Sequence, residues 1–492
     1  MTPRASLPSR IPPARRGPVG RGPRVGVVGL GYVGIATGVA FAAHGTRVVG
    51  YDVQGARRDQ VARGDSPIYE PGLDRLLRRV VRAKRLTVAS HVAELVGESD
   101  LLFVCVPTPS APDGSVDLRF VEEAVGDLAL VLRKAPGWKA VVVKSTVVPG
   151  TTEGLVREVL VRESGREIGP RLGLAANPEF LAEGSLVADA LHPSRVVIGC
   201  SDRRTARMLR EAYRGFPSPV VELSPTAAEL VKYASNAFLA SRISFANEMA
   251  ALCEAMGTDV DAVMQAVGMD PRLGPRFLRA GPGFGGSCFT KDLRALLAAA
   301  GARGVELPLS EAALTVNERQ PRHVAELAER LLGDLAGKEV ALLGLSFKAD
   351  TGDVRESRAY PILEELLRRG ARVRLHDPRS LDAFLESLPP PLHGRISREI
   401  LPMRTLREAV EGADLAVIQT DWKEYVRAGP AIWRSLRGPG VLDTRRCLYP
   451  RTLRAAGKVY AAVGRPPPAL PAAEDPEAGR SPGDLRKPAI SR

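Results

Sequence analysis

RVGVVGLGYVGIATGVAFAAHGTRVVGYD, residues 24–52, carries the strongest structural signal in the chain. A strand-like apolar run leads into Gly29, Gly31 and Gly34, a helix-like run follows, and a second strand-like run ends at Asp52. Glycines spaced as GxGxxG between a strand and a helix are typical of a dinucleotide-binding loop. The first permits a tight turn, the second lets the backbone approach a pyrophosphate, and the third lets helix pack on strand.

The cofactor expected at this loop is NAD. The start of the helix offers free N–H groups to phosphates, and a carboxylate at Asp52 accepts from ribose hydroxyls and repels a 2′-phosphate. Arg57 and Arg58 lie close enough in sequence to reduce that preference. The alternative is a glycine turn in a non-binding α/β protein. The residues predicted to bind the cofactor here are Gly29, Gly31, Tyr32, Val33, Gly34, Asp52 and Arg57.

Outward from the loop, apolar runs alternate with helical stretches, which predicts a parallel sheet covered on both faces. The predicted strands are Arg24–Val28, Arg47–Tyr51, Leu101–Val106, Ala140–Val143, Leu172–Ala176 and Val196–Gly199. Residues 226–256 contain no Gly or Pro and predict one long helix. Helical patterning continues to about residue 330, apart from a Gly-rich break at 281–286. From Lys338 the strand–helix pattern restarts, with Ser357 as the expected cap of a helix running toward Arg369, and ARVRLHDP, DLAVIQTDW and GVLDTRR as further strands.

The predicted fold class is therefore α/β: two Rossmann-like, doubly wound domains joined by a long central helix and a helical middle domain. The predicted boundaries are 24–222, 223–330 and 331–464, with disordered tails at 1–23 and 465–492. Hydrophobic residues make up 45% of the 492, and no apolar run is long enough for a membrane span. The arginine-rich start has no apolar core typical of a secretory signal, so a cytoplasmic location is the default expectation.

Charge and cysteine content limit the function classes. Residues 1–24 hold six arginines and no acid, so much of the net charge of +13 lies in the tail. No basic stripe with interleaved aromatics occurs, which argues against nucleic-acid binding. The five cysteines form no CxxC pair, so neither a disulfide framework nor a metal site is expected. An odd number leaves room for one reactive thiol, or for five buried small side chains.

GPGFGGSCFTKD, residues 281–292, is the candidate nucleophile loop. Four glycines precede Cys288, which allows close approach of backbone to ligand and exposes the thiol at the end of the loop. Lys291 and Asp292 place charge beside it, and a nearby cation lowers a thiol pKa. On the long helix, Lys232 and Asn236 share one face. Their mostly apolar neighbours, Leu230, Val231, Tyr233 and Phe238, indicate burial, and a buried Lys needs a partner or a ligand; the alternative is a solvated Lys beside a surface Asn.

Together these segments resemble the UDP-glucose/GDP-mannose dehydrogenase family over roughly residues 24–460. The matching motifs are GLGYVG, SPIYEPGL at 66–73, VPTP at 106–109, KSTVVPGTT at 144–152, NPEFLAEG at 177–184, ELVKYASNAFLA at 229–240, GFGGSCFTKD, and FKADTGDVRES at 347–357. The resemblance implies an NAD domain, a central dimerising helix and a C-terminal nucleotide-binding domain. It also implies two successive oxidations of a sugar C6 alcohol to a carboxylate, through a thiohemiacetal and a thioester on a cysteine.

The resemblance assigns roles residue by residue. The catalytic residues implied are Cys288 as nucleophile, Lys232 and Asn236 as donors to the substrate oxygen, Asp292 and Thr146 near the catalytic water, and Glu179 in thioester hydrolysis. Further cofactor contacts implied are Thr108, Thr146, Glu183, Lys291 and Arg355. Implied substrate contacts are Glu179, Phe180, Leu181, Lys232, Asn236, Phe284, Gly285, Phe347 and Lys348, together with Arg272, which matches an Arg that reaches a neighbouring subunit's substrate.

The identity of the sugar nucleotide depends on the segment after NPE. NPEFLAEG followed by HPSRVVIG resembles the UDP-glucose branch, which disfavours UDP-N-acetylmannosamine and leaves GDP-mannose as the second candidate. Thr290 stands where many members have Pro, and TGD at 351–353 varies among branches. Two other hypotheses remain: a two-electron hydroxyacid-type dehydrogenase, which needs no thiol, and a homologue that binds nucleotide sugar without catalysis.

Overall fold

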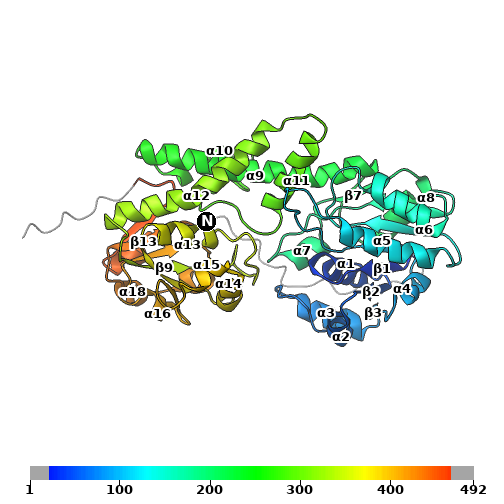
Figure 1. Ribbon diagram of the computed structural model, residues 1–492, viewed down its shortest axis with the longest axis horizontal. Helices are drawn as coiled ribbons and strands as arrows, with labels where there is room; N and C mark the ends of the chain where they lie inside the picture. The colour runs from blue at the N-terminus through cyan, green and yellow to red at the C-terminus, as the bar shows by residue number, and fades with distance from the viewer. Residues whose placement is uncertain (1–21, 467–492) are drawn as a thin grey trace, which may run out of the picture.

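The computed structural model describes residues 22–466. Two α/β units lie side by side, and the long helices of the middle region run along one edge of both (Figure 1). The tails predicted at 1–23 and 465–492 fall almost wholly outside the described residues. Within residues 22–466, the search for a helix with the length and apolarity of a membrane span finds none.

The first unit is built on a sheet of eight strands in the order β3-β2-β1-β4-β5-β6-β7-β8. The first six strands are parallel, with β1 between β2 and β4, as in a doubly wound fold. All six strands predicted in this unit are present, and the short edge strands β3 and β8 add to them. The strands are β1 Val25–Val28, β2 Val48–Tyr51, β3 Leu86–Val88, β4 Leu101–Val104, β5 Lys139–Val143, β6 Leu172–Ala176, β7 Val196–Cys200 and β8 Val220–Leu223.

The prediction of an entirely parallel sheet was wrong at one strand pair. β7 runs antiparallel to β6, with Ala176 opposite Gly199. The connection between them holds only a loop and the short helix α7 (Leu186–Leu191), so the chain never crosses back to the far edge before β7 begins. The loop that precedes α7 therefore stays at the carboxyl edge of the parallel strands.

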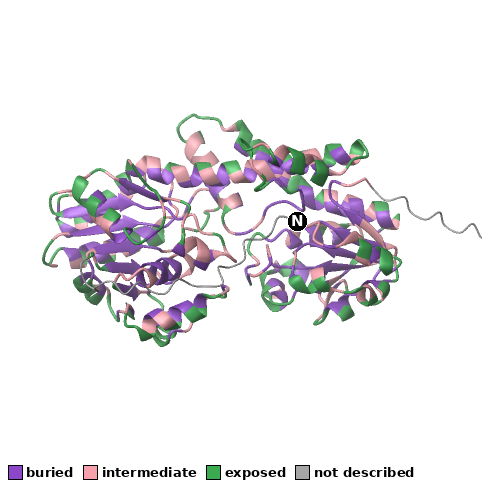
Figure 2. Cartoon of the chain, turned by 180° about the vertical axis from the view of Figure 1, so that it is seen from behind, coloured by how far each residue is buried: buried purple, intermediate pink, exposed green. Residues whose placement is uncertain are grey.

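Helices cover both faces of this sheet, and two separate apolar cores lie beneath them. Figure 2 shows the strands buried and the outward faces of the helices exposed. Because both faces are covered, strands such as LLFV at 101–104 carry no polar residue. The other helical segments are α1 Tyr32–Ala43, α2 Gly55–Arg63, α3 Leu73–Arg82, α4 Val92–Glu98, α5 Arg119–Leu132, the π-helical turn Thr152–Val156, α6 Arg157–Ser164 and α8 Arg203–Ala212.

The long helix predicted over 226–256 is confirmed as α9, Pro225–Ala255. The Ser224 side chain accepts from the Ala227 N–H and caps its start, and proline at the first position fits the helix geometry. The first half of α9 packs on the first unit through Ala228, and its second half joins the core of the second unit through Ala246 and Ala250. This helix therefore connects the two units.

Burial of part of α9 is confirmed, but two of the apolar residues that indicated it are themselves exposed. Leu230 is 46% exposed and Phe238 is 65% exposed, whereas Lys232 and Asn236 are 4% and 7% exposed. Lys232 contacts Glu179 of the first unit and Asn236 contacts Asp292 of the middle region, whereas Leu230 and Phe238 meet solvent. Three further helices complete the middle region: α10 Val260–Gly268, α11 Phe289–Gly301 and α12 Pro308–Leu332.

The second unit contains six parallel strands in the order β11-β10-β9-β12-β13-β14. The four predicted strands are present as β9, β10, β12 and β13, and β11 and β14 at the edges were not predicted. Their bounds are β9 Glu339–Leu343, β10 Arg372–His376, β11 Ile400–Pro402, β12 Leu415–Ile418, β13 Gly440–Asp443 and β14 Val459–Ala462. The helices are α13 Ala359–Arg368, α14 Leu381–Ser387, α15 Pro390–His393, α16 Leu406–Val410, α17 Lys423–Arg427, α18 Pro430–Arg434 and α19 Pro450–Ala455.

The start of α13 differs slightly from the prediction. Arg358 occupies the capping position, and the Ser357 hydroxyl accepts from the Ala359 N–H at 3.2 Å. Ser357 thus still receives an N–H from the first turn, one residue farther from the helix than expected.

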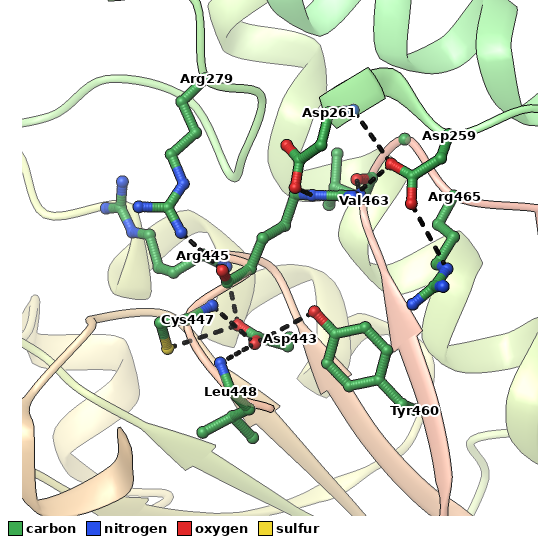
Figure 3. A network of polar contacts seen from close by, with 12 residues as sticks. Asp259, Asp261, Arg279, Asp443, Arg445, Cys447, Leu448, Tyr460, Val463 and Arg465 are labelled. Atoms are coloured by element: carbon green, nitrogen blue, oxygen red, sulfur yellow. Dashed lines mark hydrogen bonds and ion pairs between the residues drawn. The ribbon is translucent and has the colours of Figure 1, made fainter. Parts of the chain in front are cut away.

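A loop after β13 fastens the second unit to the middle region. The Arg446 side chain is 4% exposed and pairs with Asp259 and Asp261 at the start of α10, the latter at 2.8 Å. Figure 3 shows these two carboxylates above the end of β13, where buried Asp443 accepts from the backbone N–H groups of Cys447 and Leu448. Asp443 therefore shapes the turn that presents the arginine.

Candidate active site

The glycine loop has the geometry that a dinucleotide needs. Gly29 adopts φ +89°, and a Cβ there would lie 2.7 Å from the Cys105 carbonyl oxygen. A Cβ on Gly34 would lie 1.7 Å from the Gly29 carbonyl oxygen, whereas one on Gly31 would meet open space. The loop thus holds helix against strand on one side and exposes bare backbone on the other. The N–H groups of Tyr32 and the next residues, which open α1, lack helical carbonyl partners and suit phosphate oxygens.

Asp52 directly follows β2 beside this loop and is 3% exposed. Its carboxylate accepts from the N–H groups of Leu30 at 2.8 Å and Gln54 at 2.9 Å, and from Arg57 at 3.1 Å. Arg58 instead donates to the Asp52 carbonyl oxygen at 2.6 Å. Arg57 therefore pairs with the Asp52 carboxylate, whereas Arg58 bonds only backbone oxygen there. The exposed backbone at Gly31 and this buried carboxylate together fit NAD.

The other predicted cofactor contacts of this unit come to the same edge. Thr108 follows β4, Thr146 follows β5 and Glu183 lies in the loop after β6. Because β1, β4, β5 and β6 are parallel, their carboxyl ends meet along one edge of the sheet. All three residues are half-buried. The topology brings residues from positions 29 to 183 to a single strip of the molecule.

Cys288 stands at the start of α11 and is exposed. The glycines before it are required by contact with the second unit: a Cβ on Gly285 would lie 2.4 Å from the Glu356 carbonyl oxygen, and one on Gly286 would lie 2.7 Å from the Phe347 ring. The N-terminal end of a helix stabilises an anion placed there. The loop therefore places the thiol where the helix end favours a thiolate, an effect that opposes the overall rise of the Cys288 pKa.

A buried ion pair lies next to the thiol. Lys232 donates from Nζ to Glu179 Oε1 at 2.7 Å, and both side chains are less than a tenth exposed. Burial raises the pKa of Cys288, while the ammonium of Lys232 lowers it. Burial alone would raise the pKa of Glu179, but Lys232 holds it below its ordinary value. Lys232 is thus the cation expected to act on both groups.

Asp292 forms a second buried pair one helical turn after Cys288. Its Oδ2 accepts from Asn236 Nδ2 and its Oδ1 from Lys291 Nζ, each at 2.6 Å. The sequence placed Lys291 as the nearby cation for the thiol, and this interpretation was wrong. The ammonium of Lys291 is engaged by Asp292, and the cation that lowers the Cys288 pKa comes from α9, as Lys232.

The second unit reaches the same place through the loop after β9. Thr351 donates from its hydroxyl to Glu183 at 3.0 Å, and Arg355 lies 3.7 Å from the same carboxylate. Burial and then Asp353 raise the pKa of Glu183 to about 7. Burial and then Glu183 raise the pKa of Tyr32, beside the glycine loop, to about 12. Residues of both units therefore interact at the predicted cofactor edge.

The predicted substrate contacts divide into a cluster and one outlier. The centre of the Phe180 ring lies 5.8 Å from Lys232 Nζ, and Phe284 is buried in the cysteine loop. Burial lowers the pKa of Lys348, and the charges of Glu183 and Cys288 act in the opposite direction. Leu181 donates its N–H to Glu179, and Phe347 packs on Gly286. Arg272 is the outlier: its side chain is 86% exposed and pairs with Asp270, two residues away.

Three polar residues of this region were missed from the sequence. Arg445, after β13, donates to the carbonyl oxygens of Gln419 at 2.5 Å and Phe347 at 3.2 Å. Lys144 directly follows strand β5 and is 7% exposed. Thr351 contacts Glu183, as described above. A basic residue directly after a parallel apolar strand was the available signal for Arg445 and Lys144, because such positions face the carboxyl edge.

Comparison with known proteins agrees with this geometry. The descriptions matched are "UDP-glucose/GDP-mannose dehydrogenase family, NAD binding domain" at residues 23–217, "central domain" at 226–319 and "UDP binding domain" at 341–450. UDP-glucose 6-dehydrogenase YwqF of Bacillus subtilis is 37% identical, covering 89% of this chain and 97% of its own length. A Pseudomonas aeruginosa UDP-glucose 6-dehydrogenase is 39% identical, covering 90% and 98%.

A solved structure shows the same arrangement. The UDP-glucose dehydrogenase of the archaeon Pyrobaculum islandicum superposes with a TM-score of 0.81 at 41% identity, covering 90% of this chain and 98% of that one. Fold, site and relatives together define an NAD-dependent nucleotide-sugar dehydrogenase. The chain belongs to the UDP-glucose/GDP-mannose dehydrogenase family, as the sequence motifs predicted.

Proposed function

We propose that this enzyme oxidises the C6 alcohol of UDP-glucose to the carboxylate of UDP-glucuronate, removing four electrons in two steps. The observation that carries the proposal is the exposed thiol of Cys288 beside the Lys232–Glu179 pair, with the glycine loop along the same sheet edge. The named activity of the relatives supports UDP-glucose as the substrate.

NAD, when bound, accepts one hydride in each oxidation. The glycine loop, Tyr32 and Val33 would hold its pyrophosphate, and Asp52 would accept from the adenosine ribose. Thr108, Thr146, Glu183, Lys291 and Arg355 complete the proposed set of cofactor contacts. Glu183 is bonded to Thr351 of the second unit, so cofactor binding and the contact between the units share one carboxylate.

Cys288 is the proposed nucleophile. Lys232 and Asn236 present N–H groups from one face of α9 and would donate to the C6 oxygen as negative charge develops on it. The thiolate adds to the C6 aldehyde to give a thiohemiacetal, and the second oxidation leaves a thioester on the sulfur. A thiolate suits this role because it is both a strong nucleophile and a good leaving group.

Hydrolysis of the thioester needs a base and an ordered water. Glu179 is held ionised by Lys232, and Asp292 is buried and fixed by Asn236. We assign Glu179 to accept the proton of the attacking water, and Asp292 and Thr146 to orient that water. These carboxylates come from different elements, after β6 and on α11, and the charges of both act on the thiol.

For substrate binding we assign the residues that converge on the cysteine loop from both units. Phe180, Leu181, Phe284 and Gly285 contact the sugar end, and Phe347 and Lys348 the nucleotide end. Arg445 joins them as a diphosphate contact, since its half-buried guanidinium donates to the carbonyl oxygens of Gln419 and Phe347.

The oligomer we propose is a homodimer across α9. Phe238, Phe245 and Leu252 are each at least 45% exposed and recur every seven residues, which places them along one stripe of the helix. Pairing two such stripes removes the apolar surface from water. Arg272, exposed in a single chain, is then assigned to the partner's active site. Light scattering of Phe238→Glu should show a monomer with reduced activity, and a dimer of normal activity would contradict this assignment.

The test of the proposed function is NADH release per sugar consumed. Purified enzyme is supplied separately with UDP-glucose, UDP-galactose, UDP-N-acetylglucosamine, UDP-N-acetylmannosamine and GDP-mannose. We expect two NADH per UDP-glucose and the highest kcat/KM for that substrate. One NADH per sugar would indicate a two-electron dehydrogenase, a higher kcat/KM with GDP-mannose would reassign the substrate, and nucleotide-sugar binding without NADH would indicate a non-catalytic homologue.

A further inference from the structure

A second buried lysine lies behind the catalytic pair. Lys144 follows the last residue of β5, and its Nζ donates to Asn177 Oδ1 at 3.0 Å and to the Asn177 carbonyl oxygen at 3.3 Å. Both acceptors are uncharged. Asn177 is itself fixed, because its Nδ2 donates to the Val197 carbonyl oxygen at 2.7 Å and Tyr213 donates to its Oδ1 at 2.6 Å. The ammonium is therefore anchored at one place without neutralisation by its hydrogen-bond partners.

The carboxylate that interacts electrostatically with Lys144 is Glu179, two residues beyond Asn177. Burial lowers the pKa of Lys144 to about 8, and Glu179 opposes that shift. For Glu179, burial raises the pKa, Lys232 lowers it most strongly, the Leu181 N–H lowers it next, and Lys144 lowers it further. Glu179 thus interacts with two buried cations: Lys232, in direct contact, and Lys144, which is hydrogen-bonded to Asn177.

The two cations differ in what else they touch. Lys232 also faces Cys288 and Asp292, so its charge is shared with the thiolate and, in the proposed reaction, with the C6 oxygen. Lys144 instead lines a cavity of about 50 Å³ together with Glu179, Tyr213 and Thr37. When Lys232 turns to substrate, the Leu181 N–H still donates to Glu179, and Lys144 is the buried cation that still acts on its charge.

We propose that Lys144 is a positioning residue that keeps Glu179 ionised and in place for thioester hydrolysis. The inference rests on the proposed function. In that step the oxygen of water bonds to the thioester carbon, the C–S bond breaks, and its electron pair goes to sulfur. One water proton passes to Glu179 and the other to the departing sulfur, which leaves a carboxylate and a thiol. Without Lys144, Glu179 would hold its proton more readily and would be a less available base.

The test separates the oxidation half from the hydrolysis half. Stopped-flow absorbance measures the first NADH burst, and acid quench with intact-protein mass measures the acyl adduct and its decay. Lys144→Met should slow adduct decay by about 10-fold or more while changing the burst less than about 3-fold. The acid limb of the decay rate should also move to higher pH, because a carboxyl that has lost a neighbouring cation titrates later.

The matched control is Lys139→Met at the other end of the same strand. Lys139 is 5% exposed and donates to the Ser99 carbonyl oxygen at 2.6 Å, so its loss reproduces the removal of a buried lysine away from the site. It should leave the ratio of decay to burst unchanged. Equal loss of both rates in Lys144→Met, or the same selective loss in Lys139→Met, would show that Lys144 is only structural.

If Lys144→Met fails to fold, a second variant still tests the inference. Lys144→Ala opens space beside the cavity that residue 144 lines, so added ethylammonium can replace the lost cation. Adduct decay should recover by about 5-fold, with no recovery by isosteric but neutral propane. If adduct decay in Lys144→Ala is as fast as in wild type before ethylammonium is added, and ethylammonium does not change it, the inference is overturned. If wild-type enzyme forms neither adduct nor acid, the proposed function itself fails, and this inference fails with it; if wild type forms acid and the Lys144 variants decay normally, only the inference fails.

Discussion

Lys232 Nζ lies 2.7 Å from Glu179 Oε1, and this pair joins the long central helix to the loop after β6 beside the cysteine. Burial alone would lower the pKa of Lys232, but Glu179, Cys288 and Asp292 together raise it. The ammonium therefore remains charged in a buried position. One cation serves a base and a nucleophile, so the two groups are coupled in both activity and titration.

Replacing Lys232 should expose that coupling. In Lys232→Met the thiol loses the cation that opposes its burial, so the pKa of Cys288 rises. We expect the midpoint of iodoacetamide alkylation to move up by about one pH unit and kcat to fall by about 10²-fold or more. Lys291→Met is the control, because Lys291 is held by Asp292; an equal alkylation shift in that variant would contradict the role of Lys232.

Asp52 should set the choice between NAD and NADP. Asp52→Asn removes the negative charge that faces a 2′-phosphate and releases Arg57, which now pairs with Asp52. The ratio of kcat/KM for NAD over NADP is expected to fall by about 10-fold or more. Exposed Asp59 lies on α2, the helix that carries Arg57, and Asp59→Asn controls for the loss of one negative charge. An unchanged ratio in Asp52→Asn would place the ribose elsewhere.

Glu183 makes stability depend on pH in a defined direction. Its pKa in the folded chain is about 7, raised first by burial and then by Asp353, against an ordinary value of 4.5. A raised carboxyl pKa contributes stability that is complete below pH 4.5 and is lost as pH rises through 7. Between pH 5 and 8, Glu183→Gln should gain on the order of 2 kcal/mol of unfolding free energy relative to wild type. Denaturant titrations at each pH give the unfolding free energies of the two proteins. If these free energies changed with pH in the same way in wild type and Glu183→Gln, the assignment would be contradicted.

Arg446 should be a main fastening between the second unit and the middle region. Arg446→Met leaves Asp259 and Asp261 without their buried partner, and the unfolding free energy should fall by about 1–3 kcal/mol. Arg465 lies 3.6 Å from Asp259 and is 39% exposed, so Arg465→Met should cost less than about 0.5 kcal/mol. Thermal melts of both variants measure the difference. Equal decreases in melting temperature in the two variants would mean that the burial of Arg446 adds nothing to stability.

Much of this architecture follows from local sequence pattern. The glycine loop, the strand that ends at Asp52 and the long helix are each specified by a continuous segment, so periodicity and turn residues locate them within a residue or two. The reversed strand β7 was not predictable in this way. Its direction depends on where a short connection leaves the sheet. An apolar run such as VVIG predicts a buried strand but not whether that strand is parallel or antiparallel to its neighbour.

The site residues show the same division. Cys288 was recognisable because four glycines around a thiol have few structural explanations. The partners of Lys291 and Lys232 were not, because only the packing of α9 against the loop after β6 brings Lys232 to Glu179, 53 residues away. The exposure of Phe238 was missed because composition does not say which face of an apolar helix meets solvent.

The most direct test of the account is the mass of the peptide that contains Cys288 after acid quench during turnover with UDP-glucose and NAD. The account predicts an acyl adduct on Cys288 in wild type. Cys288→Ser should show no adduct and no UDP-glucuronate, with NAD affinity unchanged, and buried Cys253→Ser serves as the control. Carboxylate formation at the wild-type rate by Cys288→Ser would contradict covalent catalysis by this thiol.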